Sequence, residues 1–182
     1  MKRIVIAVGL MMLLFAVSAV AQTPAPKPGP EHKKLEIWVG DWTWEGELKA
    51  TPFGPAGKVT GKATVRPTLC GFFLEWRGEE TGPTGTNQSY EIDGYDPVAK
   101  KYTWNNFSSD GGVTTVTYTI EGTTVTYTGT QIIGGKLAHI RGTFVFTPEL
   151  TSNTGKFEIS ADGKTWMPLA EYRNKIKRLS SK

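Results

Sequence analysis

The sequence predicts an all-β protein, a single antiparallel up-and-down β-barrel of about 8–10 strands with a short N-terminal helix. From residue 41 to residue 177, apolar or aromatic residues alternate with polar ones, which is the period of a strand with one dry face. Short turns rich in Gly, Pro or Asp separate these segments in sequence order, which favours a meander. Rolling the meander into a barrel removes exposed edges, although a two-sheet sandwich would show the same alternation.

The first 21 residues predict a cleaved export signal. Two basic residues, Lys2 and Arg3, precede the apolar residues 4–17, and Ala-Val-Ala at 19–21 is a small-residue cleavage box. The apolar run is shorter than the ~20 residues that cross a bilayer as a helix. We therefore expect cleavage near Ala21, a periplasmic or secreted mature protein, and no membrane span after cleavage.

The composition limits the classes of partner. Without Lys2 and Arg3, the formal net charge of +4 becomes +2, so the mature chain is nearly balanced. Its basic surplus gathers at the C-terminal end, residues 173–182, where no aromatic residues are interleaved to stack on bases. We expect no nucleic-acid partner. The oligomeric state stays open.

The N-terminal part of the mature chain is expected to lead into the barrel. Residues 22–30 hold four prolines and predict a flexible leader. Residues 31–39 predict a short amphipathic helix, because Pro30 suits its first position and Gly40 suits its end. The barrel domain is then expected to cover residues 31–178.

Each strand is expected from its own alternation. The first, residues 41–48, has Trp42, Trp44 and Leu48 on one face. A tight turn at Glu121-Gly122 predicts a hairpin, since two-residue turns containing Gly match the twist of the strands. The remaining strands are expected at residues 58–66, at 70–78, around Tyr90 and Ile92, around Tyr102 and Trp104, and at 137–147, 156–160 and 165–177.

Several motifs resemble a known family. Residues 35–42, Leu-Glu-Ile-Trp-Val-Gly-Asp-Trp, resemble the opening of lipocalin-like barrels, where a short helix leads into Gly-x-Trp. With Gly-Tyr-Asp-Pro at 94–97 and Glu-Tyr-Arg at 171–173, the chain is similar to the bacterial DUF1579 proteins over residues 30–178. The resemblance implies an exported, calycin-type barrel of unestablished biochemical role. It implies that Trp42 closes one end of the barrel and that Gly94 and Asp96 set a turn.

A closed sheet lined with aromatic rings is either a filled core or a cavity for an apolar guest. Our leading hypothesis is a non-enzymatic barrel that binds a small apolar or amphipathic ligand by hydrophobic burial, with Tyr hydroxyls orienting it. One alternative is a structural or interaction module of the cell envelope with a filled barrel. Another is an enzyme that uses lumen carboxylates or Tyr. The candidate lumen residues are Trp42, Trp44, Phe72, Trp76, Tyr90, Tyr102, Trp104, Tyr118, Tyr127 and Phe144.

The sequence predicts no catalytic, metal or cofactor site. It contains no nucleophile elbow, zinc-protease motif, phosphate loop or dinucleotide fingerprint. We expect Glu91, Asp93 and Asp96 to be ordinary turn residues rather than a cation site. We expect His139 on the wet face of its strand, away from the apolar pocket that a haem ligand needs. Cys70 is expected to be buried and inert.

Overall fold

The computed structural model describes residues 25–179, so the predicted export signal lies outside the described residues. A short α-helix, α2 (Pro30–Lys34), continues into a 3₁₀ turn, η2 (Leu35–Trp38), as the Pro30 and Gly40 signals predicted. Ten strands follow, with a second 3₁₀ turn, η3 (Leu69–Gly71), between the second and third. The strands are β1 Gly40–Leu48, β2 Gly57–Thr68, β3 Phe73–Gly82, β4 Gly85–Asp96, β5 Lys101–Ser108, β6 Val113–Glu121, β7 Thr124–Ile133, β8 Lys136–Phe146, β9 Ser152–Ser160 and β10 Met167–Lys177.

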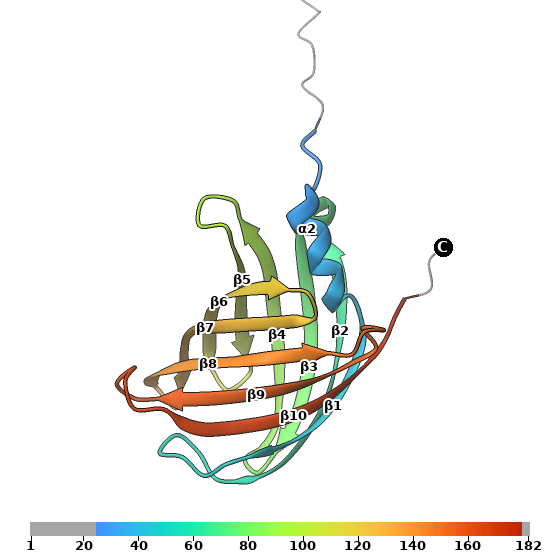
Figure 1. Cartoon of the computed structure of the whole chain (residues 1–182). Helices are drawn as coiled ribbons and strands as arrows, with labels where there is room; N and C mark the ends of the chain where they lie inside the picture. Colours follow the sequence, from blue (N-terminus) through green and yellow to red (C-terminus); the bar gives the residue numbers. More distant parts are fainter. Residues whose placement is uncertain (1–24, 180–182) are drawn as a thin grey trace, which may run out of the picture.

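The ten strands form a closed antiparallel barrel (Figure 1). Each strand pairs with its neighbours in sequence, and β1 closes the sheet by pairing with β10 as well as with β2. The predicted up-and-down barrel is therefore confirmed, and the two-sheet sandwich is excluded. Closure leaves no edge strand, so the backbone of every strand has a partner on both sides.

The register decides which side chains face inward, because residues directly opposite each other lie on the same face of the sheet. Trp42 lies opposite Ala63 on β2 and Ile176 on β10, and all three are buried. Inward-facing Val65 and Ile159 have no exposed surface. The core therefore occupies the inside of the barrel. In Figure 1, α2 lies at one end of this interior and the β1–β2 loop lies at the other.

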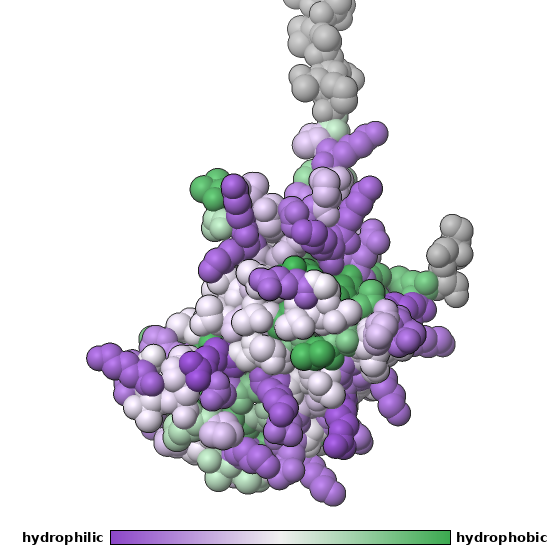
Figure 2. Space-filling model, viewed as in Figure 1, coloured by the Kyte–Doolittle hydropathy of each residue, from purple (hydrophilic) through white to green (hydrophobic). Residues whose placement is uncertain are grey.

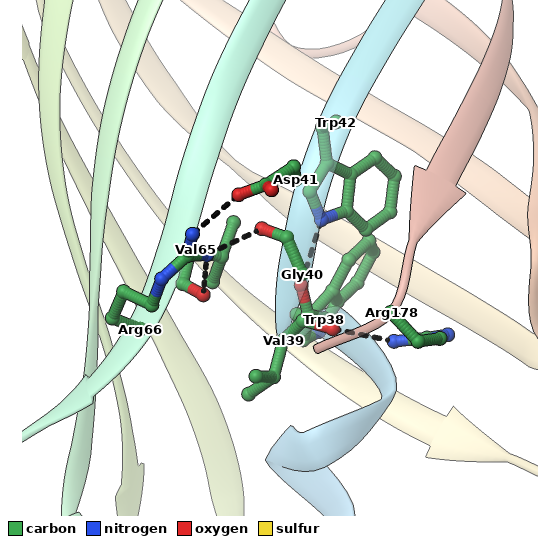
Figure 3. Close-up of polar contacts among 8 residues, drawn as sticks. All are labelled: Trp38, Val39, Gly40, Asp41, Trp42, Val65, Arg66 and Arg178. Atoms are coloured by element: carbon green, nitrogen blue, oxygen red, sulfur yellow. Dashed lines mark hydrogen bonds and ion pairs between the residues drawn. The ribbon is translucent and has the colours of Figure 1, made fainter. Parts of the chain in front are cut away.

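The end that carries α2 is shut by aromatic rings and by an arginine from the end of the chain (Figure 3). The Trp42 indole Nε1 donates a hydrogen bond to the Trp38 carbonyl at 2.7 Å. Arg178 Nη1 donates to the Ile37 and Val39 carbonyls, each at 2.9 Å. These carbonyls end a short helix and have no intrahelical partner, so the guanidinium satisfies them. Trp42 thus lies at the closed end, as the family resemblance implied.

The helix α2 is held to the barrel by aromatic contacts and one hydrogen bond. The His32 ring packs edge-on against Phe72 and Tyr95, with ring centroids 5.0 and 5.8 Å apart. The Tyr102 hydroxyl donates to Glu31 Oε2 at 2.7 Å. Phe72 and Tyr102 therefore hold the helix α2 against the barrel.

Two local expectations are wrong. Cys70 is exposed rather than buried, because η3 interrupts the strand alternation and holds Cys70 at φ 59°. Gly94 lies within β4 rather than in a turn, and a side chain there would overlap the Phe73 ring. Asp96 does set the turn that follows, since its Oδ1 accepts hydrogen bonds from the backbone of Val98 and Ala99 at 2.8 and 3.0 Å.

The predicted hairpin is present with a shifted turn. Its turn residues are Gly122 and Thr123, so that Glu121 pairs with Thr124 and Tyr118 with Tyr127. Both tyrosines face inward, and threonines occupy the outer face.

The face of the molecule shown in Figure 2 is near-neutral to hydrophilic over much of its area. Among residues 25–179, no helix has the length and apolar character required to cross a membrane.

We predict that Arg178→Met destabilises the protein by about 2 kcal/mol and lowers Tm by about 4–8 °C, because it leaves carbonyls at the closed end without a donor. Chemical denaturation and calorimetry measure both quantities. Arg173→Met is the matched control, since Arg173 is exposed on β10, the strand that ends just before Arg178, and its replacement should change stability by less than about 0.5 kcal/mol. Equal effects of the two substitutions would show that Arg178 does not close the barrel.

Candidate functional site

The barrel encloses a cavity of about 590 Å³. Trp38 and Trp42 lie at its floor, next to the closed end. Residues from the β1–β2 loop, the β3–β4 turn and the β5–β6 turn line its mouth, among them Phe53, Pro83 and Asp110. These loops belong to the end of the barrel opposite α2, so the interior opens there. The structure therefore shows a barrel with an interior cavity rather than a filled barrel.

The walls of this cavity differ in character. Strands β7 to β10 contribute an aromatic and apolar wall that includes Tyr127, Phe144 and Phe157. Strands β3 to β6 contribute a polar wall that includes Glu80, Glu91, Asp93, Asn106 and Thr114. A guest molecule would therefore meet aromatic rings on both walls and carboxylates on the polar wall.

Each of the three carboxylates of the polar wall accepts a hydrogen bond from an aromatic side chain. Trp44 Nε1 donates to Glu80 Oε2 at 2.8 Å. Trp104 Nε1 donates to Glu91 Oε2 at 2.6 Å.

The deepest pair is formed with a tyrosine. The Tyr118 hydroxyl donates to Asp93 Oδ2 at 3.1 Å. Because these donors are neutral, they fix the positions of the carboxylates without cancelling their charge.

Burial perturbs all three acids. Burial raises the pKa of Glu80 and of Glu91, against the hydrogen bonds from the indoles, which lower it. Burial raises the pKa of Asp93 well above its usual range, and the negative charge of Glu91 raises it further. Perturbed pKa values of this kind cluster at functional sites because function often requires buried, coupled acids.

Some buried polar atoms of the cavity lining have no hydrogen-bond partner within the described part of the chain. They are Trp38 Nε1, Trp76 Nε1, Asp93 Oδ1 and the Tyr127 hydroxyl. Asp93 and Tyr127 are each only 3% exposed. A buried donor or acceptor without a partner costs about 1–3 kcal/mol, so the native barrel tolerates these atoms at a measurable expense in stability.

A glycine positions one of the indoles. Gly61 lies opposite Trp44 in the β1–β2 register, and a side chain at Gly61 would overlap the indole ring. The missing side chain lets the Trp44 ring lie against the β2 backbone. From there Nε1 reaches across β2 to Glu80 on β3, so this polar contact depends on a residue with no side chain.

The structure places most of the predicted lumen residues around the cavity. Those that line it are Trp42, Trp44, Trp76, Trp104, Tyr118, Tyr127 and Phe144. Phe72 and Tyr102 instead contact the α2 helix, as described above. Tyr90 lies on the outer face, 37% exposed, with the Arg77 guanidinium 4.8 Å from its ring centre. Ligand binding by the lining residues stays a prediction.

The three acids are the residues that sequence reasoning misplaced or missed. Glu80 was not singled out, and the expectation that Glu91 and Asp93 belong to a turn is wrong, because β4 continues to Asp96. A signal was present in the turn at residues 97–100. The register across this turn pairs Asp96 with Lys101, which puts Asp93 opposite Trp104. If Trp104 faces inward, Asp93 must do so too.

Of the remaining candidates, His139 lies outside the lining of the cavity. His139 is half-buried beside the turn at Gly163, on the opposite face of β8 from buried Ala138 and Ile140. Residues 25–179 hold no group of three or more His, Cys, Asp or Glu side chains arranged to hold a metal ion.

Comparison with known families now places the chain. A family model described as "Protein of unknown function (DUF1579)" matches residues 27–167. The chain belongs to DUF1579. A comparison with curated proteins finds no match. Neither comparison assigns an activity to the cavity.

Three solved structures are similar to this chain at low sequence identity. The crystal structure of Rv2717c from M. tuberculosis is similar with a TM-score of 0.59 and 10% identity, over 82% of this chain and 99% of that one. A de novo designed fluorescence-activating β-barrel has a TM-score of 0.44 and 13% identity, over 78% and 95% of the two chains. The S-type phycobiliprotein lyase CPES from Guillardia theta has a TM-score of 0.48 and 13% identity, over 84% and 94%.

We predict that Asp93→Asn raises the free energy of unfolding at pH 8 by about 1–3 kcal/mol, because it removes a buried charge with no cationic partner. A raised pKa in the folded state means that the neutral acid is the form compatible with folding. Stability from that form is complete below the ordinary Asp pKa of about 3.9 and is lost as the pH rises through the raised value. The gain should therefore shrink toward pH 4 in urea denaturation curves. A gain that does not change with pH would contradict this account of Asp93.

Proposed function

We propose that this DUF1579 protein is exported and binds a small amphipathic molecule inside its barrel. The observation that carries the proposal is the cavity of about 590 Å³, closed at the α2 end and open at the other. Sites for small organic ligands commonly have volumes of about 300–1,000 Å³ and combine apolar walls with a few placed polar groups. The lumen has both properties.

Two kinds of contact would hold the guest. The rings of Tyr127, Phe144 and Phe157 remove its apolar part from water, which contributes about 25 cal/mol per Å² buried. The polar wall across from them fixes the orientation of the guest by hydrogen bonds. The guest would enter through the mouth, since the Trp38–Trp42 layer and Arg178 close the other end.

We predict that Ala170→Trp weakens ligand binding by about tenfold or more, because Ala170 lines the cavity and an indole there would occupy space that the ligand needs. Binding is measured by Tm shifts against a library of amphipathic amines, alcohols and carboxylic acids, followed by titration of the hits. Val145→Trp is the control, since Val145 lies on the outer face of the barrel and is 48% exposed.

If no compound raises Tm, or if hits bind Ala170→Trp and the unmodified protein equally, the cavity is not a binding site. Binding lost equally in both tryptophan variants would show a general effect of the substitution rather than occupation of the lumen.

Export is tested separately. We predict that the full chain, produced in a bacterium with a general secretion pathway, appears outside the cytoplasm with Gln22 as its first residue. Intact-mass measurement of the envelope fraction identifies that residue. Replacing Lys2 and Arg3 with Glu should retain the precursor in the cytoplasm. An uncleaved precursor in the envelope would point to a membrane anchor instead.

A second candidate function is acid–base catalysis in the lumen. The neighbouring acids Glu91 and Asp93 favour it, because each has a raised pKa and one can donate a proton while the other accepts it. Recovery of hits from the thermal-shift screen separates the two functions. A binding protein returns its ligand unchanged, whereas an enzyme converts it at a rate that Glu91→Gln or Asp93→Asn reduces.

A further inference from the structure

The cavity holds carboxyl groups whose negative charge, once they ionise, no neighbouring cation of the protein balances. Glu80, Glu91 and Asp93 all belong to its lining. Among the described lining residues, Lys49 is the one basic side chain; it lies at the mouth, and its Nζ is 3.0 Å from Glu47 Oε1. The three acids therefore have no cation from the protein beside them. Buried carboxylates without a cationic partner are unfavourable, and folds normally avoid them.

Aromatic rings surround this negative charge. Trp44 and Trp104 hydrogen-bond to Glu80 and Glu91, and Trp76 lies opposite Glu91 in the β3–β4 register. The faces of indole and phenol rings attract organic cations, most strongly where water is excluded. Carboxylates and ring faces therefore act on the same kind of guest.

Two buried atoms of the lining remain open to such a guest. Asp93 Oδ1 accepts no hydrogen bond within the described residues, although Oδ2 of the same carboxylate accepts from Tyr118 and the nearby Trp76 indole lowers the pKa of Asp93. The Tyr127 hydroxyl, on the strand paired with that of Tyr118, is likewise without a partner there. An ammonium group could donate to Asp93 Oδ1, and a second polar group of the guest could meet Tyr127.

From the three acids, the encircling rings and these open atoms, we infer that the lumen binds an organic cation, an amphipathic aromatic amine whose ammonium group lies beside Glu91 and Asp93. This inference rests on the proposed function and specifies its ligand class. A metal ion fits less well. One oxygen of Glu80 and one of Glu91 already accept from indoles, and the described residues contain no cluster with the arrangement of metal ligands.

The same geometry makes binding depend on pH. The groups that face the acids are Trp44, Trp76, Trp104, Tyr118 and Tyr172, with Lys49 and Asp110 at the mouth. None of the groups deep in the lumen supplies a positive charge. A bound ammonium would supply one and lower the raised pKa values of Glu91 and Asp93, so binding releases protons. Affinity for the amine therefore rises with pH through the range in which the empty lumen's acids ionise.

The test uses three probes with one skeleton and different charge: 4-phenylbutylamine, 4-phenylbutanol and 4-phenylbutanoate. Isothermal titration at pH 8 should give an affinity for the amine about tenfold or more above that for the alcohol, with the carboxylate weakest. Repeating the amine titration in two buffers of different ionisation enthalpy should reveal proton release. Lowering the pH to 5 should weaken binding of the amine and leave the affinity for the alcohol unchanged.

Variants assign the effect to the lumen acids. Glu91→Gln and Asp93→Asn should each weaken amine binding by about tenfold and leave alcohol binding within about twofold. Glu79→Gln is the matched control. Glu79 neighbours Glu80 but points outward, with Lys62 Nζ 3.5 Å from its carboxylate, so its removal should not change amine binding.

The outcomes distinguish the inferred ligand class from lumen binding itself. If the alcohol or the carboxylate binds as tightly as the amine, the inferred ligand class is wrong while lumen binding stands. If the Glu91→Gln and Asp93→Asn variants bind the amine as well as the unmodified protein does, these two acids do not recognise its ammonium group. If none of the three probes binds, both the ligand class and the proposed function fail.

Discussion

Closure of the sheet is the constraint on which the rest of the structure depends. Because β1 pairs with both β2 and β10, every strand has fixed neighbours, and a shift of one residue in any pair would turn its side chains inside out. The closed register therefore determines the lumen residue by residue. It brings Trp44 from β1 to Glu80 on β3, and Tyr118 from β6 to Asp93 on β4. Residues distant in sequence become one wall of one cavity.

Strand β4 shows what this constraint imposes. Its apolar residues Tyr90 and Ile92 face outward, while Glu91 and Asp93 face the lumen, which inverts the usual binary pattern of a half-buried strand. On the outer face, Tyr90 lies opposite Phe107 of β5, so a row of apolar side chains continues there. An inversion of this kind lowers stability and is expected where a site needs it. Two of the three acids of the polar wall thus come from one strand placed against the prevailing pattern.

Much of the fold follows from local signals in the sequence, and part of the site does not. The helix at Pro30, the turn set by Asp96 and the inward faces of the other strands were predictable from turn residues and alternation. Alternation alone cannot choose a face for β4, because both of its faces carry large side chains. Pairing across the turn at residues 97–100 resolves the choice. The exposure of Cys70 was not predictable, since a 3₁₀ turn interrupts the pattern without a Pro at that point. The cavity volume depends on how rings from many strands pack, which no local pattern contains.

The proposed recognition depends on Glu91 and Asp93 being buried in the lumen without a cationic partner. Carboxyl-selective ¹³C NMR titration of the protein without added ligand measures the effect of that burial on each side chain. The account predicts that the Glu91 and Asp93 resonances titrate above the ordinary range for their residue types, with Asp93 the more strongly displaced. Titration of both at the ordinary values for Glu and Asp would mean that water reaches these side chains freely and that the lumen described here does not exist.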